Sequence, residues 1–357
     1  MKKAIILFNL GGPDKLDNVE PFLFNLFYDP AILNLPTFLR YPLAKLISNR
    51  RAPIAKKIYE ELGGSSPILK LTLDQSNVLE KKLNQNDSEN EYKCFIVMRC
   101  WHPRAEKVIN DVKIYNPDEV VLLPLYPQYS AATSGSSIKE WHDVCKKNNY
   151  KTKTSTICCY PTDNLFVKSH VEEIKSKIKN LDNYKLIFSA HGLPEKNIRK
   201  GDPYQWQVEQ TVNHIVKNLN LDNLDWILSY QSRVGPLKWI GPSTDDVIVE
   251  NSKLGKKIVI VPIAFVSEHS ETLVELDIEY ADLARRAGVH SYQRVPTLGI
   301  SDDFMLALGN MAKSASCDSY EHPVQEANWC PPQLQLCCKS LGGKHGAQPT
   351  VWSGNKP

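Results

Sequence analysis

The sequence lacks the features that would place the protein in a membrane or on nucleic acid. No apolar run approaches the roughly 18 residues that a membrane-spanning helix needs. The formal net charge is only +3, and no Lys/Arg run interleaves with aromatic residues, which argues against nucleic acid. The apolar start at residues 4–8 is too short for a signal peptide and leads into Asn9 and a glycine turn. We therefore expect a globular, cytoplasmic protein.

Two widespread catalytic motifs are also absent. The chain has no Gly-x-Gly-x-x-Gly, which argues against a dinucleotide-binding enzyme, and no His-Glu-x-x-His, which argues against a zinc hydrolase. Its nine cysteines are an odd number in a chain of 357 residues, so a disulfide framework is not indicated. Four of them lie close to the carboxyl terminus and suggest metal ligation instead: Cys317, Cys330, Cys337 and Cys338.

Apolar runs that end in polar loops alternate with helical patterns along most of the chain. This rhythm predicts two similar doubly wound, Rossmann-like parallel-sheet domains of the α/β class with a cleft between them. We expect the first domain at residues 1–153, the second at 154–312 and a cysteine-bearing extension at 313–357. The second domain should contain strands at residues 155–159, 186–190, 226–230 and 258–264.

A histidine follows the buried strand expected at residues 186–190. In a parallel sheet, the residue just past the carboxyl end of a strand faces the crevice where ligands bind, and His191 has that position. A neutral imidazole there can accept a proton or hold a divalent metal. The alternative is a loop histidine that only makes structural hydrogen bonds.

An acidic helix is expected eighty residues further on, with Ser270 as its N-cap. Glu271, Glu275, Glu279 and Asp282 have the spacing that puts them on one face of a regular helix. A row of carboxylates leading to an imidazole suits the conduction of divalent cations or protons. The alternative is an ordinary solvated face.

The segment 22–46 is rich in Phe, Leu and Pro and allows two interpretations. It is either helical core, or a mobile apolar lip that grips a flat hydrophobic ligand and touches a bilayer.

Together these motifs resemble ferrochelatase, and its alphaproteobacterial members in particular. The resemblance extends from about residue 4 to residue 310. It is carried by Leu10–Pro13, Gly63–Pro67, Arg99 with His102 and Pro103, Tyr126–Tyr129, Thr133–Ser137, Ser189–Pro194, Gly201–Tyr204, Gln231–Pro236, Trp239–Pro242 and Ser267–Leu273. It implies a lyase that inserts Fe²⁺, as substrate, into protoporphyrin IX with release of two protons, in the last step of haem biosynthesis.

The same resemblance implies roles for individual residues. His191 and Glu271 would form the metal and proton-accepting site, with an acidic path through Glu268, His269, Glu275 and Glu279 behind it. The segment 22–46 would be the apolar lip. The implied porphyrin-binding residues are Arg50, Arg51, Tyr59, Ser66, Arg99, Tyr126, Tyr204, Ser232 and Trp239.

Some ferrochelatases hold a [2Fe–2S] cluster on one internal and three carboxy-terminal cysteines. This chain has Ala131 where animal members have the internal cysteine, and its tail is one residue shorter than the bacterial Cys-x₆-Cys-x-Cys pattern. Cys317 could replace one ligand of the tail, and Cys158 or Cys159 could be the fourth, internal ligand. A zinc site or a tail of spare thiols are the alternatives. The candidate cluster ligands are Cys158, Cys330, Cys337 and Cys338.

Two alternative functions remain open from the sequence. One is a chelatase that uses coproporphyrin or another metal, and the other is a non-catalytic carrier of haem or metal. A peripheral contact with the inner membrane is compatible with the sequence. The sequence does not indicate an oligomeric state.

Overall fold

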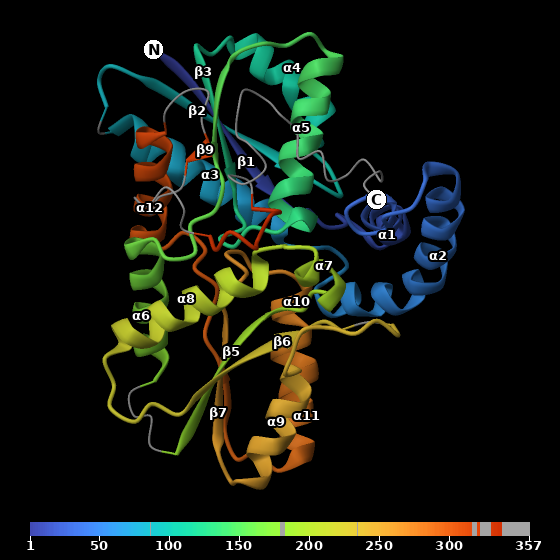
Figure 1. Ribbon diagram of the computed structural model, residues 1–357, viewed down its shortest axis with the longest axis vertical. Coiled ribbons are helices and arrows are strands. Elements are labelled where there is room, and N and C mark those ends of the chain that lie inside the picture. The colour runs from blue at the N-terminus through green and yellow to red at the C-terminus, as the bar shows by residue number, and fades with distance from the viewer. Residues whose placement is uncertain (86, 179–182, 234, 316–319, 322–329, 338–357) are drawn as a thin grey trace.

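The protein is built on two parallel β-sheets with helices packed around them, as the computed structural model shows (Figure 1). The structure describes residues 1–85, 87–178, 183–233, 235–315, 320–321 and 330–337. The first sheet has the order β2-β1-β3-β4-β9 and the second the order β6-β5-β7-β8. All described strand pairs within these sheets are parallel, so the predicted α/β class with two doubly wound sheets is confirmed.

Each sheet is centred on a strand that is buried along most of its length. β1 (Lys2–Asn9) lies between β2 (Glu91–Met98) and β3 (Glu119–Pro124). β5 (Tyr184–His191) lies between β6 (Trp226–Gln231) and β7 (Lys257–Pro262). These strands are apolar along most of their length because helices cover both faces of a parallel sheet, so that side chains on both faces are buried. The outer strands are β4 (Lys153–Ile157), β8 (Tyr292–Arg294) and β9 (Tyr320–Glu321).

Helices make the connections between successive parallel strands, as right-handed crossovers require. In the first half these are α1 (Val19–Tyr28), α2 (Thr37–Glu61), α3 (Ile68–Gln85), α4 (Ala105–Tyr115) and α5 (Ser136–Lys147). In the second half they are α6 (Asn164–Lys177), α7 (Glu195–Arg199), α8 (Tyr204–Leu219), α9 (Thr244–Lys253), α10 (Ser270–Leu273), α11 (Tyr280–Ala287) and α12 (Asp302–Ser314). Two π-helical turns interrupt this pattern, η2 (Ala131–Gly135) and η3 (Glu275–Glu279), and η1 (Leu16–Asn18) is a 3₁₀ turn.

The strand predicted at residues 155–159 was assigned to the wrong sheet. β4 pairs with β3, from Lys153 opposite Glu119 to Thr156 opposite Leu122, and so belongs to the first sheet. The local pattern of strand, loop and helix is the same whichever sheet receives the strand, so the sequence could not distinguish the two. The expected domain limits at residues 1–153, 154–312 and 313–357 stay a prediction.

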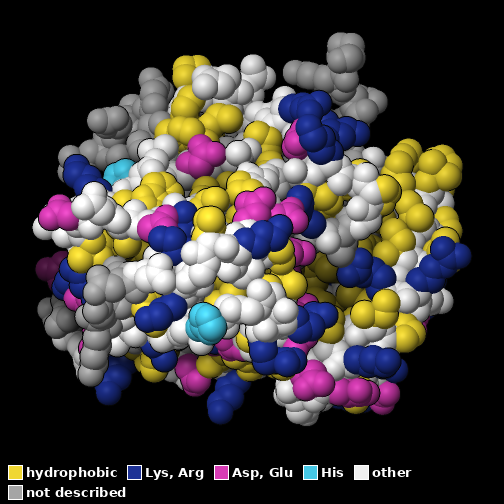
Figure 2. Space-filling model, turned by 90° about the horizontal axis from the view of Figure 1, so that it is seen from below, with side chains coloured by type: hydrophobic (Ala, Val, Ile, Leu, Met, Phe, Trp, Pro, Cys, Tyr) yellow, Lys and Arg dark blue, Asp and Glu magenta, His cyan; other side chains and the backbone are white. Residues whose placement is uncertain are grey.

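The segment 22–46 divides between the two interpretations that the sequence allowed. Phe22 and Leu23 on α1 are buried against Tyr59 and Trp101, which is core packing. The start of α2 instead exposes its apolar side chains, led by Phe38, whose exposed fraction is 75%. Hydrophobic side chains gather along the edge of the molecule where α2 lies (Figures 1 and 2). The exposed apolar group comprises Ile32, Phe38, Leu39, Tyr41, Leu46 and Ile54.

The length and apolar character of the helices determine whether one of them could cross a membrane. Among the described residues, no helix combines the length and the apolar character that crossing a bilayer requires.

Candidate active site

The carboxyl end of β5 brings an imidazole against a carboxylate from a distant helix. His191 is the last residue of β5, and its Nδ1 lies 2.7 Å from Oε2 of Glu271, on α10. α10 begins shortly after β7, the strand that neighbours β5, and lies between the two sheets (Figure 1). The side chain of His191 is 40% exposed and that of Glu271 24% exposed. The site predicted at His191 and Glu271 is therefore brought together by the fold.

The electrostatics of this pair make the imidazole of His191 a stronger base than that of an isolated histidine. Burial alone would lower the pKa of His191, but the charge and hydrogen bond of Glu271 outweigh it and raise that pKa. Burial likewise opposes ionisation of Glu271, yet His191 holds the pKa of this carboxyl below its ordinary value. Among the described residues, no hydrogen-bond partner is found for Nε2 of His191, so this nitrogen is free to meet a substrate.

A second carboxylate, Glu275, lies one turn behind the first. It accepts hydrogen bonds from Gln231 Nε2 (3.0 Å) and from the backbone N–H of Ser232 (2.7 Å), and the Ser232 hydroxyl also donates to it. Ser232 has φ of +61°, a left-handed conformation that is strained for a residue other than glycine. This conformation lets one residue direct both donors at Glu275. Burial and the nearby Glu271 raise the pKa of Glu275.

Glu268 and His269 flank the pair but have different surroundings. Glu268 accepts from Arg294 Nη1 at 2.8 Å and from the backbone N–H of Thr297 at 3.0 Å. Although burial raises the pKa of Glu268, these interactions lower it overall. His269 is buried, burial lowers its pKa, and its Nδ1 has no partner in the described part of the chain. Burial therefore favours the neutral form of His269, whose acidic neighbours are Glu268 and Glu271.

The prediction that the four acids share one continuous helical face was wrong. The π-helical turn η3 at Glu275–Glu279 separates α10 from α11. A π turn contains more residues than an α turn, so side chains beyond it rotate away from the register that regular spacing predicts. Glu279 is exposed, and Asp282 pairs with Arg286 Nε at 2.8 Å. Within the described residues, the acidic row in the site thus ends at Glu275.

Three of the predicted porphyrin-binding residues lie around the histidine. Tyr204 donates its hydroxyl to the backbone oxygen of His191 at 3.0 Å. The ring of Trp239 packs on Gly192, so closely that an added Cβ there would lie 3.2 Å from the ring. Tyr59 reaches in from α2: burial raises its pKa to about 12, and Ser270 and Glu271 are its polar neighbours. These rings form the wall of the site.

Ser232, which the resemblance implied to bind the porphyrin, lies beside the two glutamates of the site. Its hydroxyl is directed at the carboxylates, 3.5 Å from Glu271 Oε2 and closer to Glu275. Arg50 and Arg51 are exposed on α2, and Ser66 is half-buried where its backbone N–H donates to Pro13 O at 2.8 Å. No described contact joins these three residues to His191, so their porphyrin role stays a prediction.

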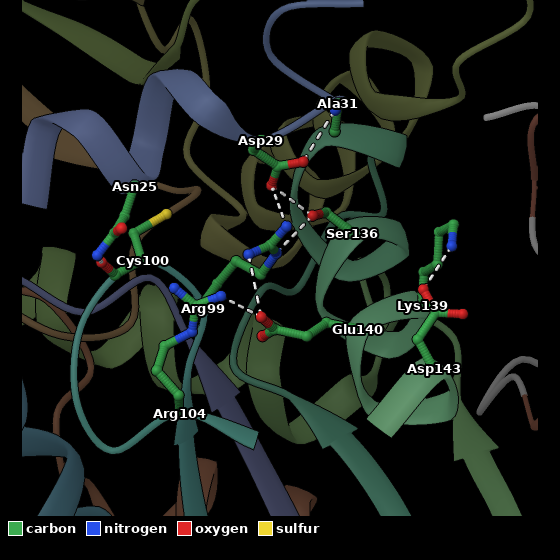
Figure 3. Close-up of polar contacts among 10 residues, drawn as sticks. All are labelled: Asn25, Asp29, Ala31, Arg99, Cys100, Arg104, Ser136, Lys139, Glu140 and Asp143. Atoms are coloured by element: carbon green, nitrogen blue, oxygen red, sulfur yellow. Dashed lines mark hydrogen bonds and ion pairs between the residues drawn. The ribbon is translucent and has the colours of Figure 1, made fainter. Parts of the chain in front are cut away.

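Arg99 is the centre of a buried ion network beside Asp29, the residue that follows α1 in the segment 22–46 (Figure 3). Its Nη2 lies 2.8 Å from Asp29 Oδ2, its Nη1 3.4 Å from Glu140 Oε1, and its Nε donates to Ser136 Oγ at 2.7 Å. Arg104 also pairs with Glu140. The Arg99 guanidinium is therefore engaged by carboxylates of the protein itself. Its role in porphyrin binding stays a prediction, as does that of half-buried Tyr126, whose pKa burial raises.

Cysteine sulfurs gather at a second place, around the buried side chain of Gln207. Its Nε2 donates to Cys159 Sγ at 3.3 Å and to Cys330 Sγ at 3.4 Å, and contact with Cys337 raises the pKa of Cys330. Cys158 lies 3.8 Å from Cys159, sulfur to sulfur, and is disulfide-bonded.

Cysteine thiolates suit iron or zinc by their chemistry. Across the described ranges, no group of three or more donors is arranged to hold a metal ion. Cys317 and Cys338 lie outside the described residues.

Three residues of the site were not predicted as functional. Gln231 holds the two glutamates together, because its Nε2 donates to Glu271 O at 2.9 Å as well as to Glu275. Its place at the end of a strand was a usable signal. Tyr280 and Arg294 were not recognisable from the sequence, because neither lies in one of the motifs that pointed to the site.

Comparisons with known proteins identify relatives in sequence and in fold. Residues 2–316 match the family model described as Ferrochelatase. The chain is 72% identical over 335 residues to a ferrochelatase of Pelagibacter ubique, which covers 94% of this chain and 96% of the relative. It is 51% identical over 314 residues to a ferrochelatase of Rickettsia felis, with 87% and 90% covered. In fold it is similar to SirB from Bacillus subtilis with Fe³⁺, at a TM-score of 0.53 and 14% identity over 88% of this chain and 95% of that one.

Proposed function

The chain belongs to the ferrochelatase family, and we propose that its His191–Glu271 pair is where ferrous iron enters the porphyrin. The enzyme is a lyase, a metal chelatase that forms protohaem from Fe²⁺ and protoporphyrin IX. In this reaction two pyrrole N–H bonds break, two bonds from these nitrogens to iron form, and two protons leave. Neither iron nor porphyrin changes oxidation state.

The observation that carries the proposal is the orientation of the imidazole. Glu271 occupies Nδ1 of His191 at 2.7 Å, so the unpartnered Nε2 is the atom that can take a pyrrole proton or meet the metal. The carboxylate stabilises the imidazolium that proton transfer produces, as in other base–carboxylate pairs. Imidazole and carboxylate together are also ligands that suit ferrous iron.

The surrounding rings supply the binding surface. Tyr59, Tyr204 and Trp239 gather at the imidazole–carboxylate pair, and a flat macrocycle needs such apolar walls with a few polar groups between them. A porphyrin held there presents its pyrrole hydrogens to His191. We keep Arg50, Arg51, Ser66, Arg99 and Tyr126 as proposed contacts of the porphyrin periphery.

The decisive experiment is anaerobic insertion of Fe²⁺ into protoporphyrin IX by the wild-type protein and by His191→Ala. We expect the variant to lose turnover by on the order of 10²-fold or more, as for loss of a general base, while porphyrin binding measured by fluorescence is retained. His290→Ala, which removes an exposed histidine, is the matched control and should keep full activity. If both proteins bind porphyrin without inserting iron, the site is a carrier instead. Parallel reactions with coproporphyrin and with other divalent metals test the alternative substrates.

We further propose a [2Fe–2S] cluster on Cys158, Cys330, Cys337 and Cys338, which requires that the disulfide of Cys158 be reduced so that its thiolate can bind iron. The support is the gathering of Cys158, Cys159, Cys330 and Cys337 around Gln207. Such a cluster would supply redox-active iron bound by thiolate, and no step of iron insertion depends on it here. Absorbance bands of the purified protein, with iron and sulfide analysis of Cys330→Ser, test this proposal. A colourless wild-type protein without bound iron would contradict it.

A cytoplasmic location with a peripheral membrane contact is the last part of the proposal. Its support is the exposed apolar group at the start of α2, from Phe38 to Leu46, next to the exposed Arg50 and Arg51. Apolar side chains beside basic ones are typical of a surface that rests on an anionic bilayer.

A further inference from the structure

A tyrosine hydroxyl lies between a buried carboxylate of the site and a carboxylate at the surface. Tyr280 OH is 3.1 Å from Glu275 Oε1 and 3.2 Å from Asp245 Oδ1. A phenol has a single hydrogen to donate, so at any moment it can satisfy only one of these two oxygens. The same phenol oxygen can accept a hydrogen bond from whichever carboxyl group is protonated. This arrangement is that of a proton relay with two positions.

The inner end of this arrangement reaches the imidazole–carboxylate pair. The Ser232 hydroxyl donates to Glu275 Oε2 and lies 3.5 Å from Glu271 Oε2, which in turn is 2.7 Å from His191 Nδ1. Because a serine hydroxyl both donates and accepts, it can take a proton on one side and release its own on the other. Glu275 is therefore connected to Glu271 and His191 through the Ser232 hydroxyl.

The outer end opens to solvent. Asp245 is exposed in the first turn of α9, which packs beside α11 (Figure 1). Tyr280 is the first residue of α11 and is buried in the packing between these helices. The π-helical turn that moves Glu279 to the outside is the same turn that brings Tyr280 against Glu275.

The other acidic route behind the site is closed by an arginine. Arg294 binds Asp277 through Nε at 2.6 Å and Nη2 at 2.7 Å, and its Nη1 binds Glu268 at 2.8 Å. A permanently protonated guanidinium with two carboxylates fixed on it cannot accept a proton. Glu268 Oε1 is thus held by a group that cannot take a proton from it, so Arg294 provides no onward step on this side.

We propose that the protons released by iron insertion leave the site through Ser232, Glu275 and Tyr280 to Asp245 at the surface. This inference rests on the proposed function of the His191–Glu271 pair. Each pyrrole proton passes from His191 to the glutamates. Glu275 then gives a proton to the phenol oxygen while the phenol hydrogen moves to Asp245. Rotation of the hydroxyl restores the starting arrangement before the second proton, and water takes each proton from Asp245.

The test compares two tyrosines of one helix-packing cluster. Tyr280→Phe removes the relay hydroxyl and keeps the ring, whereas Tyr292→Phe removes a hydroxyl that donates only to the backbone oxygen of Leu276, at 2.6 Å. Fe²⁺ insertion into protoporphyrin IX is followed by absorbance, and proton release in the same mixing experiment by a pH indicator. Asp245→Asn, at an exposed position, is the second variant and is used if Tyr280→Phe does not fold.

We expect Tyr280→Phe and Asp245→Asn to lower kcat by about tenfold, less than the roughly 10²–10⁴-fold effect of a direct acid or base. The KM for porphyrin should not change, and high concentrations of imidazole buffer should restore the rate by carrying protons instead. Tyr292→Phe should behave as the wild type. Wild-type turnover and proton release in both relay variants would overturn the inference, and so would a loss that buffer does not restore. A wild-type protein without iron insertion would instead refute the proposed function itself.

Discussion

Breaking the buried ion pair between Asp29 and Arg99 should weaken the protein strongly, because the arginine would keep its charge without its best partner. The exposed fractions of the two side chains are 3% and 12%. Asp29 also accepts from Ser136 Oγ at 2.5 Å and from the backbone N–H of Ala31 at 2.9 Å, just after α1 ends. This carboxylate therefore connects the end of α1 to the residue that follows β2 and to the first residue of α5 (Figure 3).

The expected magnitude follows from what remains after the change Asp29→Asn. Removing one partner of a buried pair costs roughly 3–5 kcal/mol. Glu140 still faces Arg99 at 3.4 Å, so we expect the lower end, a loss of about 3 kcal/mol in the free energy of unfolding. The double variant Asp29→Asn with Arg99→Met removes the stranded charge, so its loss should be smaller than the sum of the two single losses.

Urea unfolding followed by circular dichroism measures these differences. Asp143→Asn is the matched control, since Asp143 pairs with Lys139 on the exposed side of α5 in the same region, and its loss should not exceed about 0.5 kcal/mol. If Asp29→Asn is no less stable than Asp143→Asn, or if the two buried changes are simply additive, our account of this network is wrong.

Three further predictions concern the site and its surroundings. Glu271→Gln removes the charge that raises the pKa of His191, so in the metal-free protein the NMR titration of this histidine should move to lower pH. In the wild type, the free energy of unfolding that the pair contributes is lost as pH rises through the raised pKa of His191. The variant should not show this loss of stability. If the titration of His191 does not move in the variant, the proposed pairing is wrong. Gly12→Ala would place a Cβ 2.5 Å from Ser66 Cβ, so we expect a destabilisation of about 1–3 kcal/mol in thermal unfolding, and an unchanged Tm would show that the loop can shift. Phe38→Asp should reduce co-sedimentation with anionic vesicles and leave the insertion kinetics in detergent unchanged; wild-type binding by the variant would exclude this surface as the membrane contact.

Much of the site was predictable because parallel sheets obey a simple geometric rule. The carboxyl ends of neighbouring strands meet at one edge, so a histidine at the end of β5 and polar residues at the end of β6 had to come close together. Glu271 was predictable too, as the first acidic residue of a helix that follows the neighbouring strand. The buried strands themselves follow from unbroken apolar runs such as residues 4–8 and 258–261.

The local sequence pattern does not determine which of the two sheets contains β4. Nothing in residues 153–157 distinguishes pairing with β3 from pairing with a strand of the second sheet, because either would bury the same side chains. The choice depends on the crossover made by α5 and on contacts far away in the sequence.

What the sequence by itself determined was the chemistry at the strand ends: the imidazole at His191 and the carboxylates that begin at Glu271. Only the tertiary structure decided which acids take part. One π-helical turn moved Glu279 outward and Tyr280 inward, since a helix that gains a residue in a turn rotates everything after it. Arg294, 26 residues from Glu268 along the chain, neutralised that carboxylate through an ion pair that no local spacing predicts.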